Sequence, residues 1–236
     1  MSEILKTESL AGGYTDVDII HGIDLCVMAD EIVTIAGTNG AGKSTFLKAL
    51  LGLLPRTSGR VSIFGRDVSR LPVEDRIEIG MAYVPQVTNV FRTLTVLENL
   101  QVADRGMTGD RIDRMLSAFP ALKPRLRQRA GTLSGGERQQ LAFARALARE
   151  PKVIVLDEPT AALSPGLVQT VFQLIIGLKE MGVAVLMVEQ RARQSLEISD
   201  RGYILDQGRA VLSGAASDLL SDPRMTELYL GTATHT

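Results

Sequence analysis

Apolar and polar positions along the chain follow different periodicities in different regions. From residue 3 to residue 36 many apolar positions recur at every second residue, which is typical of half-buried strands. Within this region, residues 32–36 form a nearly continuous apolar run that predicts a fully buried strand. A glycine-rich turn follows, and residues 43–51 then have the pattern of a helix. Residues 60–65 and 81–84 predict further strands.

The middle of the chain, about residues 87–148, predicts a helical lobe. Long apolar strands are absent from this stretch, and helical spacing occurs over 95–103 and 110–119, with arginine and lysine between the apolar positions. A charged run at 123–129 is expected to form a turn inside it. We therefore expect this lobe to be inserted into an α/β core.

From residue 152 onward, strand and helix patterns alternate again. The expected elements are a strand at 152–157, a helix at 165–180, a strand at 183–188, a helix at 191–198, and a short hairpin followed by helical turns over 203–231. Such alternation predicts a parallel sheet with helices on its faces. The whole chain, 1–236, is expected to be one domain with the helical lobe inserted in its α/β core.

Composition narrows the classes of function. A length of 236 residues with 45% apolar residues suits one large domain with a sizeable core. The net charge of -1 and the aromatic content of 4% argue against nucleic acid as a partner. The single cysteine, Cys26, fits a reducing compartment. No apolar run approaches the about 18 residues of a membrane-spanning helix, and the first ten residues lack the features of a signal peptide.

A glycine-rich segment after the buried strand carries the clearest chemical motif. Eight residues match the phosphate-binding pattern G-x-x-x-x-G-K-[ST]: Gly37, Thr38, Asn39, Gly40, Ala41, Gly42, Lys43 and Ser44. The glycines let the backbone curve around a phosphate, and the following helix presents its positive end. Lys43 is expected to reach the β- and γ-phosphates of ATP, and the Ser44 hydroxyl to ligate Mg²⁺. Thr45 belongs to the same candidate site, and the alternative is a strand-to-helix turn with a chance match.

A second motif lies at the end of the predicted strand 152–157. Two adjacent carboxylates, Asp157 and Glu158, follow an apolar run there. Ligands bind at this edge of an open parallel sheet, so Asp157 is a candidate for holding Mg²⁺. Glu158 points differently because side chains alternate along a strand, and it is the candidate to polarise the attacking water. The alternative is a strand that ends in a solvated acidic turn.

A third motif opens a helix further along the helical lobe. It comprises Leu133, Ser134, Gly135, Gly136 and Glu137. Ser134 and Glu137 have the spacing of a capping box, and the two glycines at a helix start describe a second anion-binding terminus. The capping and the anion-binding interpretations are compatible with each other.

Together, and in this order, the three motifs resemble those of the nucleotide-binding subunits of ABC transporters, and the resemblance covers essentially the whole chain. It implies a P-loop NTPase fold with an N-terminal antiparallel β subdomain. It also implies that two subunits pair head to tail, with each ATP held between the phosphate loop of one and residues 133–137 of the other. Gln86 matches a glutamine that senses Mg²⁺ and nucleotide and faces the membrane subunit, and Tyr14 matches an aromatic residue that stacks on adenine.

Two positions depart from the family pattern. The family usually has a histidine after the strand next to the Asp–Glu strand, whereas this chain has Gln190, which can donate a hydrogen bond but carries no titratable proton. The segment that usually contains an aspartate reads Ala162-Leu163-Ser164-Pro165, in which Ser164 and Pro165 suit a helix start.

Gln190, the segment 199–208 and the ending 228–231 resemble the smaller ATPase of branched-chain amino-acid importers. The resemblance therefore implies ATP hydrolysis that drives uptake of these amino acids, from the cytoplasmic face of the membrane. The implied partners are permease subunits, indirectly a substrate-binding protein, and a second ATPase, in a heterodimer or alternatively a homodimer. The alternatives are an ATPase of urea or amide import or of lipopolysaccharide export, a non-transport ABC ATPase, and a subunit that only binds nucleotide.

Overall fold

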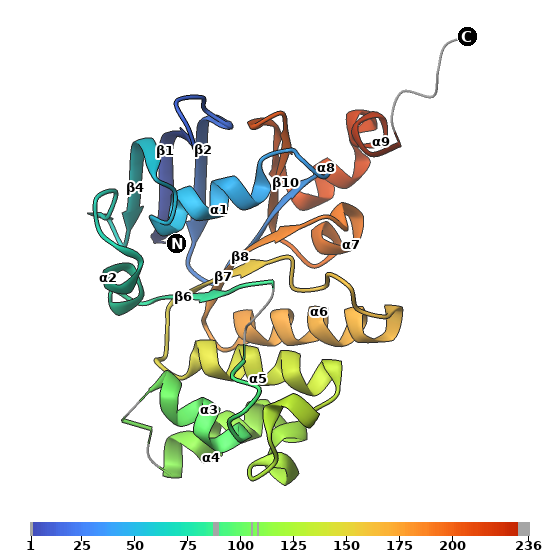
Figure 1. The fold of residues 1–236 in the computed structure, drawn as a ribbon. Helices are drawn as coiled ribbons and strands as arrows, with labels where there is room; N and C mark the ends of the chain where they lie inside the picture. The colour runs from blue at the N-terminus through green and yellow to red at the C-terminus, as the bar shows by residue number, and fades with distance from the viewer. Residues whose placement is uncertain (1, 87–89, 105, 108, 231–236) are drawn as a thin grey trace.

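The computed structural model describes residues 2–86, 90–104, 106–107 and 109–230 (Figure 1). Its strands are β1 Glu3–Gly13, β2 Ile20–Met28, β3 Ile32–Gly37, β4 Arg56–Ile63, β5 Arg66–Asp67, β6 Met81–Val84, β7 Val153–Asp157, β8 Ala184–Glu189, β9 Arg201–Asp206 and β10 Arg209–Ala215. Its helices are α1 Lys43–Leu51, α2 Val73–Glu78, α3 Val96–Ala103, α4 Gly109–Ala118, α5 Gly135–Leu147, α6 Pro165–Glu180, α7 Ala192–Glu197, α8 Ala216–Ser221 and α9 Pro223–Leu230, with short 3-10 turns at Pro120–Arg125 and Ala130–Thr132.

The central sheet has six strands in the order β10-β9-β3-β8-β7-β6. The neighbouring pairs β9–β3, β3–β8, β8–β7 and β7–β6 are parallel, whereas β10 is antiparallel to β9. Ile154 packs in the core on one face of this sheet, and Val153 and Val155 pack in the core on the other. Burial on both faces explains the continuous apolar runs, and the parallel arrangement places the carboxyl ends of five strands at one edge.

A second, antiparallel sheet has the order β2-β1-β4-β5. Helix α1 contacts strands of both sheets, and its side chains Phe46 and Leu50 are fully buried in the core that they share. This packing fixes the start of α1, and therefore the glycine-rich turn before it, at the edge of the central sheet.

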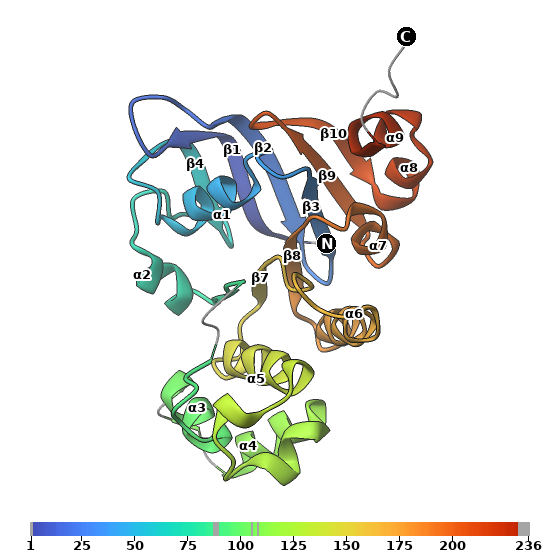
Figure 2. The same cartoon turned by 45° about the vertical axis from the view of Figure 1, so that its right-hand side comes forward.

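The helical lobe consists of α3, α4 and α5 and lies below the sheets in Figures 1 and 2. Helix α5 contacts both α3 and α6, so it joins the lobe to the parallel core. The close approach is visible at Gly136, where an added Cβ would lie 2.8 Å from a methyl group of Leu167 on α6.

The predicted fold class is confirmed, with differences at particular elements. The strand expected at 60–65 runs from Arg56 to Ile63, because Phe64 and Gly65 adopt φ values of 51° and 73° and turn the chain. Helix α2 was not predicted, and the charged run at 123–129 begins inside a 3-10 turn. The hairpin expected within 203–231 is β9–β10, which starts at Arg201.

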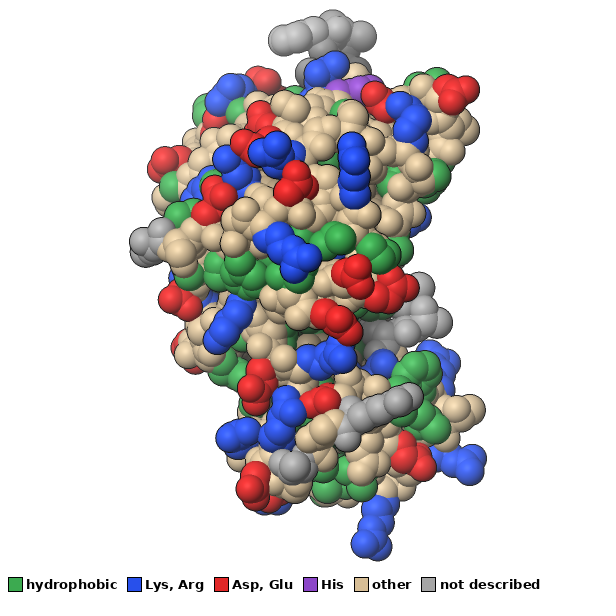
Figure 3. Space-filling view, turned by 90° about the vertical axis from the view of Figure 1, so that its left-hand side faces the viewer, with side chains coloured by type: hydrophobic (Ala, Val, Ile, Leu, Met, Phe, Trp, Pro, Cys, Tyr) green, Lys and Arg blue, Asp and Glu red, His purple; other side chains and the backbone are tan. Residues whose placement is uncertain are grey.

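The surface shown in Figure 3 carries lysine and arginine side chains interspersed with aspartate and glutamate over both lobes. On this face the basic side chains do not form one continuous patch. In the described ranges of the chain, no helix has the length and apolar character needed to cross a membrane.

Candidate functional site

The turn between β3 and α1 has the geometry of a phosphate-binding loop. Gly40 and Gly42 have φ values of 85° and 99°, a region that favours glycine. Helix α1 starts after Gly42 with no side-chain cap and no acidic residue in its first turn. An uncapped positive helix end favours an anion. Gly37 ends β3, and Thr38, Asn39, Gly40, Ala41 and Gly42 form the turn that leads directly into α1.

Lys43 lies folded over this turn. Its Nζ donates hydrogen bonds to the carbonyl oxygens of Gly37 at 2.9 Å and of Thr38 at 3.1 Å, and its side chain is only 4% exposed. Ser44 beside it is exposed, and Thr45 is buried. Among the described residues, the partners of this buried ammonium are two neutral carbonyls and one carboxylate, and it is suited to exchange them for phosphate oxygens.

The carboxylate near Lys43 belongs to Glu158, just beyond the end of β7. Glu158 Oε1 lies 3.8 Å from Lys43 Nζ, and Gln86 Nε2 donates to Glu158 Oε2 at 3.0 Å. Glu158 has a φ of 43°, and its backbone N–H donates to Val188 O at 2.9 Å. The structure thus brings together three of the predicted residues from the ends of three separate segments.

Asp157 is the last residue of β7. Its Oδ2 accepts a hydrogen bond from the Tyr83 hydroxyl at 3.3 Å, whereas its Oδ1 is buried and has no hydrogen-bond partner among the described residues. Burial, and secondly the charge of Glu158, raise the pKa of Asp157. Burial and the charge of Asp157 likewise raise the pKa of Tyr83 to about 12. The sequence offered no signal for Tyr83, because its role depends on the pairing of β6 with β7.

The donor set fits a magnesium ion. Mg²⁺ prefers oxygen ligands and commonly takes one or two from the protein and others from phosphate and water. The unpartnered Oδ1 of Asp157 is a buried acceptor that a cation would satisfy. The Ser44 hydroxyl and the side-chain amide oxygen of Gln86 are the other predicted ligands, and both residues are exposed.

Gln190 directly follows Glu189, the last residue of β8. Strand β8 pairs with both β3 and β7. Its side chain is exposed, and its backbone N–H donates to Glu189 Oε2 at 3.2 Å. Glu189 itself is 1% exposed, and its Oε1 accepts hydrogen bonds from Thr160. Burial raises the pKa of Glu189, because the hydrogen bonds to the carboxylate only partly offset its desolvation. Sequence reasoning did not assign a role to Glu189 or to Thr160.

Tyr14 lies beyond the end of β1 and beside α1. The residue is 47% exposed, and its hydroxyl accepts a hydrogen bond from Lys48 Nζ at 2.9 Å. The ring therefore presents an accessible face next to the helix that starts at the phosphate loop, which suits the expected stacking on a base.

Residues 133–137 lie at the start of α5. Ser134 is the N-cap, and the capping box predicted with Glu137 is confirmed by hydrogen bonds in both directions, at 2.8 Å and 3.3 Å. The bond that the Glu137 carboxylate accepts from the Ser134 N–H lowers the pKa of Glu137. In the part of the chain that the structure describes, no hydrogen bond or ion pair joins these residues to the phosphate loop. Leu133, Gly135 and Gly136 are placed by the same helix start.

The predicted start of α6 is also observed. Ser164 is its N-cap and Pro165 its first residue, although the Ser164 hydroxyl makes no capping hydrogen bond. Ala162, two residues earlier, has a φ of 58°. The segment between Glu158 and α6 therefore makes a tight turn directly after the carboxylates.

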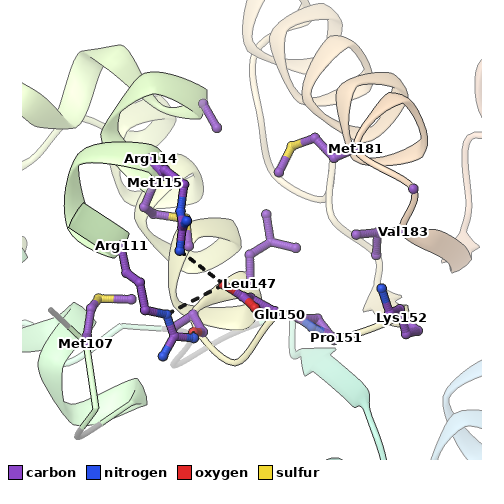
Figure 4. Close-up of a pocket in the computed structure, with 13 residues that line it drawn as sticks. Met107, Arg111, Arg114, Met115, Leu147, Glu150, Pro151, Lys152, Met181 and Val183 are labelled. Carbon is purple, nitrogen blue, oxygen red and sulfur yellow. Dashed lines mark hydrogen bonds and ion pairs between the residues drawn. The ribbon is translucent and has the colours of Figure 1, made fainter.

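A separate pocket of about 230 Å³ lies between the helical lobe and the turn after α6 (Figure 4). Its apolar lining includes Met107, Met115 and Met181. Arg111 and Arg114 each lie 3.6 Å from the Glu150 carboxylate at its edge. None of the predicted site residues lines this pocket.

Comparison with known proteins places these features in a family. The ABC transporter family profile matches residues 20–161, more than half of the chain. A probable branched-chain amino acid transport ATP-binding protein, LivF of Archaeoglobus fulgidus, is 42% identical over 97% of this chain and 99% of its own length. The high-affinity branched-chain amino acid transport ATP-binding protein BraG of Pseudomonas aeruginosa is 40% identical over 97% of this chain and 100% of its own.

A more distant relative is the lipopolysaccharide export system ATP-binding protein LptB of Haemophilus influenzae, 35% identical over 97% of both chains. Among solved structures, the ADP conformation of an ATP-binding cassette of an ABC transporter superposes with a TM-score of 0.87 and 28% identity. That similarity covers 98% of this chain and 100% of the other. The phosphate loop, the carboxylate pair and the full-length similarity agree, and the chain belongs to the ABC transporter family as an ATP-binding, ATP-hydrolysing subunit.

Proposed function

We propose that this subunit energises the import of branched-chain amino acids. The observation that carries the hydrolytic part is the cluster in which Glu158 lies between Lys43, at 3.8 Å, and Gln86, at 3.0 Å, directly after Asp157. This solute class is favoured because the relatives with 42% and 40% identity are both branched-chain amino acid transport ATP-binding proteins.

The site residues are proposed to act by positioning and by charge neutralisation. Lys43 releases the carbonyls of the loop and binds the β- and γ-phosphates. Glu158 orients the attacking water and accepts its proton. As the carboxylate turns to the water, it gives up the hydrogen bond that Gln86 donates to it. Gln190 donates a hydrogen bond to the γ-phosphate, and Tyr14 stacks on adenine. The remaining loop residues, including Thr45, hold the phosphates through backbone N–H groups and the start of α1.

Ser44, Asp157 and Gln86 are the residues proposed to hold Mg²⁺. Asp157 would offer its unpartnered Oδ1 to the ion, which would supply positive charge to offset the negative charge of the phosphate oxygens. Burial raises the pKa of Asp157, and a cation beside the carboxylate would lower it.

The chain is proposed to work in a larger assembly. Residues 133–137 lie at the start of α5, whereas the phosphate loop lies before α1. We propose that residues 133–137 complete the site of a second ATPase subunit. We propose a heterodimer with a second ABC ATPase, with a homodimer as the alternative. Permease subunits would hold the pair at the cytoplasmic face of the membrane, with a substrate-binding protein acting through them. Residues 1–236 would serve as a single domain in this assembly.

Labelled leucine uptake tests this function. Cells lacking the protein would be complemented with the parent chain, with Glu158→Gln, or with Glu197→Gln as a control. Among the described residues, Glu197 forms an ion pair with Arg193 on the surface of α7 and with no residue of the site, so its variant should restore uptake. We expect the parent and the control to restore uptake and Glu158→Gln to fail. In the isolated complex, Glu158→Gln should bind ATP but hydrolyse it at least about 100-fold more slowly. Parental hydrolysis by this variant would refute the assignment of the base.

Lipopolysaccharide export is the second candidate function, because the relative at 35% identity belongs to such a system. Unchanged leucine uptake in the deletion strain, together with a defect in lipopolysaccharide transport, would favour it. Unchanged leucine uptake with a loss of urea uptake would instead favour urea or amide import.

A further inference from the structure

We propose that Glu189 is a positioning residue for hydrolysis, which fixes Gln190 and the segment after Glu158 relative to each other through Thr160. The inference rests on the proposed roles of Glu158 and Gln190. Glu189 is the last residue of β8, and its side chain points into the protein and not into solvent, with 1% of its surface exposed.

Three hydrogen bonds converge on this one carboxylate. Glu189 Oε1 accepts from the backbone N–H of Thr160 at 2.9 Å and from its hydroxyl at 2.8 Å. Glu189 Oε2 accepts from the backbone N–H of Gln190 at 3.2 Å. Thr160 is also fully buried, so these bonds form where water does not compete.

The end of strand β7 explains why the carboxylate is needed. Asp157 pairs with Val188, and the next residue, Glu158, still donates to Val188 O at 2.9 Å. The chain then turns at Glu158 and passes through Pro159, which has no N–H group. The N–H of Thr160 is therefore the next donor, and it is buried away from the strand. Glu189 supplies the acceptor that the backbone ladder no longer offers.

The consequence concerns two side chains of the site. Thr160 follows Glu158 by two residues, and the N–H of Ala161 donates back to Glu158 O at 3.0 Å. Gln190 adjoins Glu189 in the chain. One buried carboxylate thus sets the separation between the proposed base and the proposed γ-phosphate donor. In the described structure its side-chain hydrogen bonds go to Thr160 and Gln190 and not to residues 37–45, so its loss should slow hydrolysis more than it weakens ATP binding.

The test measures kcat and KM for ATP in the complete transporter complex. Glu189→Ala should lower kcat by about 100-fold and Thr160→Val by about 10-fold, with KM changed less than about 3-fold, because a misplacement of about 1 Å can cost about 100-fold in rate. Glu189→Gln keeps an acceptor for Thr160 and should recover part of the loss. The double variant of Thr160→Val and Glu189→Ala should be no slower than Glu189→Ala alone.

Thr34→Val is the matched control. Thr34 lies on β3 and, like Thr160, is fully buried. Its hydroxyl shares a hydrogen bond of 2.7 Å with Ser199 Oγ, away from the carboxylates. This variant should lower thermal stability and leave kcat unchanged. If Thr34→Val slows hydrolysis as much as Thr160→Val does, the effect is a general loss of packing and the inference is overturned.

Two further outcomes separate the inference from the proposed function. If Glu158→Gln retains parental hydrolysis, the proposed site itself is wrong. If Glu158→Gln is inactive while Glu189→Ala and Thr160→Val keep parental kcat, the site stands and the positioning role of Glu189 is refuted. A rise in KM alone in either variant would likewise overturn the positioning role.

Discussion

Replacing Asp157 with asparagine should stabilise the nucleotide-free chain and remove most of its stabilisation by MgATP. The Oδ1 atom of this carboxylate is buried without a partner in the described structure, and burial raises the pKa of the group. The ionised form is therefore disfavoured in the folded, nucleotide-free state. Asparagine removes the charge and keeps nearly the same shape, and its amide oxygen can still accept the hydrogen bond from Tyr83.

The expected gain follows from the cost of leaving a buried acceptor unsatisfied, which is about 1–3 kcal/mol and is larger for charged groups. Asparagine still buries a polar atom, so we expect it to recover about 1–2 kcal/mol of this. For a chain of this length, that corresponds to a rise of roughly 2–8 °C in Tm. Since the folded pKa of Asp157 is raised, its contribution to stability is greatest below its unfolded pKa and falls as pH rises. The gain should therefore grow as pH rises from below 3.8, the ordinary pKa of the aspartate side chain, toward neutral pH.

The assay is thermal and urea unfolding of the chain with EDTA and without nucleotide, repeated with MgATP. A ligand at 100 times its Kd stabilises a protein by about 2.7 kcal/mol, and the variant should show much less than the parent under the same conditions. Asp67→Asn is the control of opposite sign. Asp67 is exposed and accepts hydrogen bonds from Ser69 that lower its pKa, so this variant should gain no stability and should respond fully to MgATP. A lower Tm for Asp157→Asn than for the parent without nucleotide would refute the reasoning.

Two other predictions follow from the same edge of the sheet. Gly42→Ala should weaken ATP binding by at least about 10-fold in a fluorescent-nucleotide titration. A residue with a Cβ is strained at φ 99°, and this Cβ would lie 3.2 Å from Gly208 Cα. Unchanged affinity would contradict this prediction. Glu189→Gln should melt below the parent by a margin that narrows as pH rises, because the raised folded pKa of Glu189 makes its contribution largest below its unfolded pKa. A series of melting curves across pH checks this, and a margin that widens with pH would show that the sign is wrong.

The parts of the fold that could be predicted are those whose causes are local in sequence. The phosphate loop is a strand, a turn with two glycines at positive φ and an uncapped helix start, all within residues 32–51. The capping box of Ser134 and Glu137 spans one helical turn. Burial of the central strands on both faces produces apolar runs that need no knowledge of which strands are neighbours.

Helix α2 shows why other elements escaped prediction. It is six residues long, starts after Pro72 and has too few turns for an apolar periodicity to be visible. Arg76 holds this helix in place: it is 1% exposed and donates hydrogen bonds to the backbone oxygens of Leu71 and Ser69. Arg76 also donates a hydrogen bond to Leu50 O on α1, 26 residues away. A buried arginine with backbone carbonyls as acceptors is invisible in a sequence pattern, because arginine is read there as an exposed residue.

The same limit applies within the site and defines what sequence patterns can contribute. Tyr83 meets Asp157 across 74 positions and Thr160 meets Glu189 across 29, and both contacts depend on the order β8-β7-β6. A motif fixes the residues that touch the nucleotide, because the shape of a phosphate constrains them within one turn. The residues that hold those groups in place are constrained only by the sheet, and any neighbouring strand that supplies a buried acceptor can serve. If Glu189 sets the position of Gln190, then the glutamine that replaces the family's usual histidine depends on a carboxylate that no loop motif would reveal.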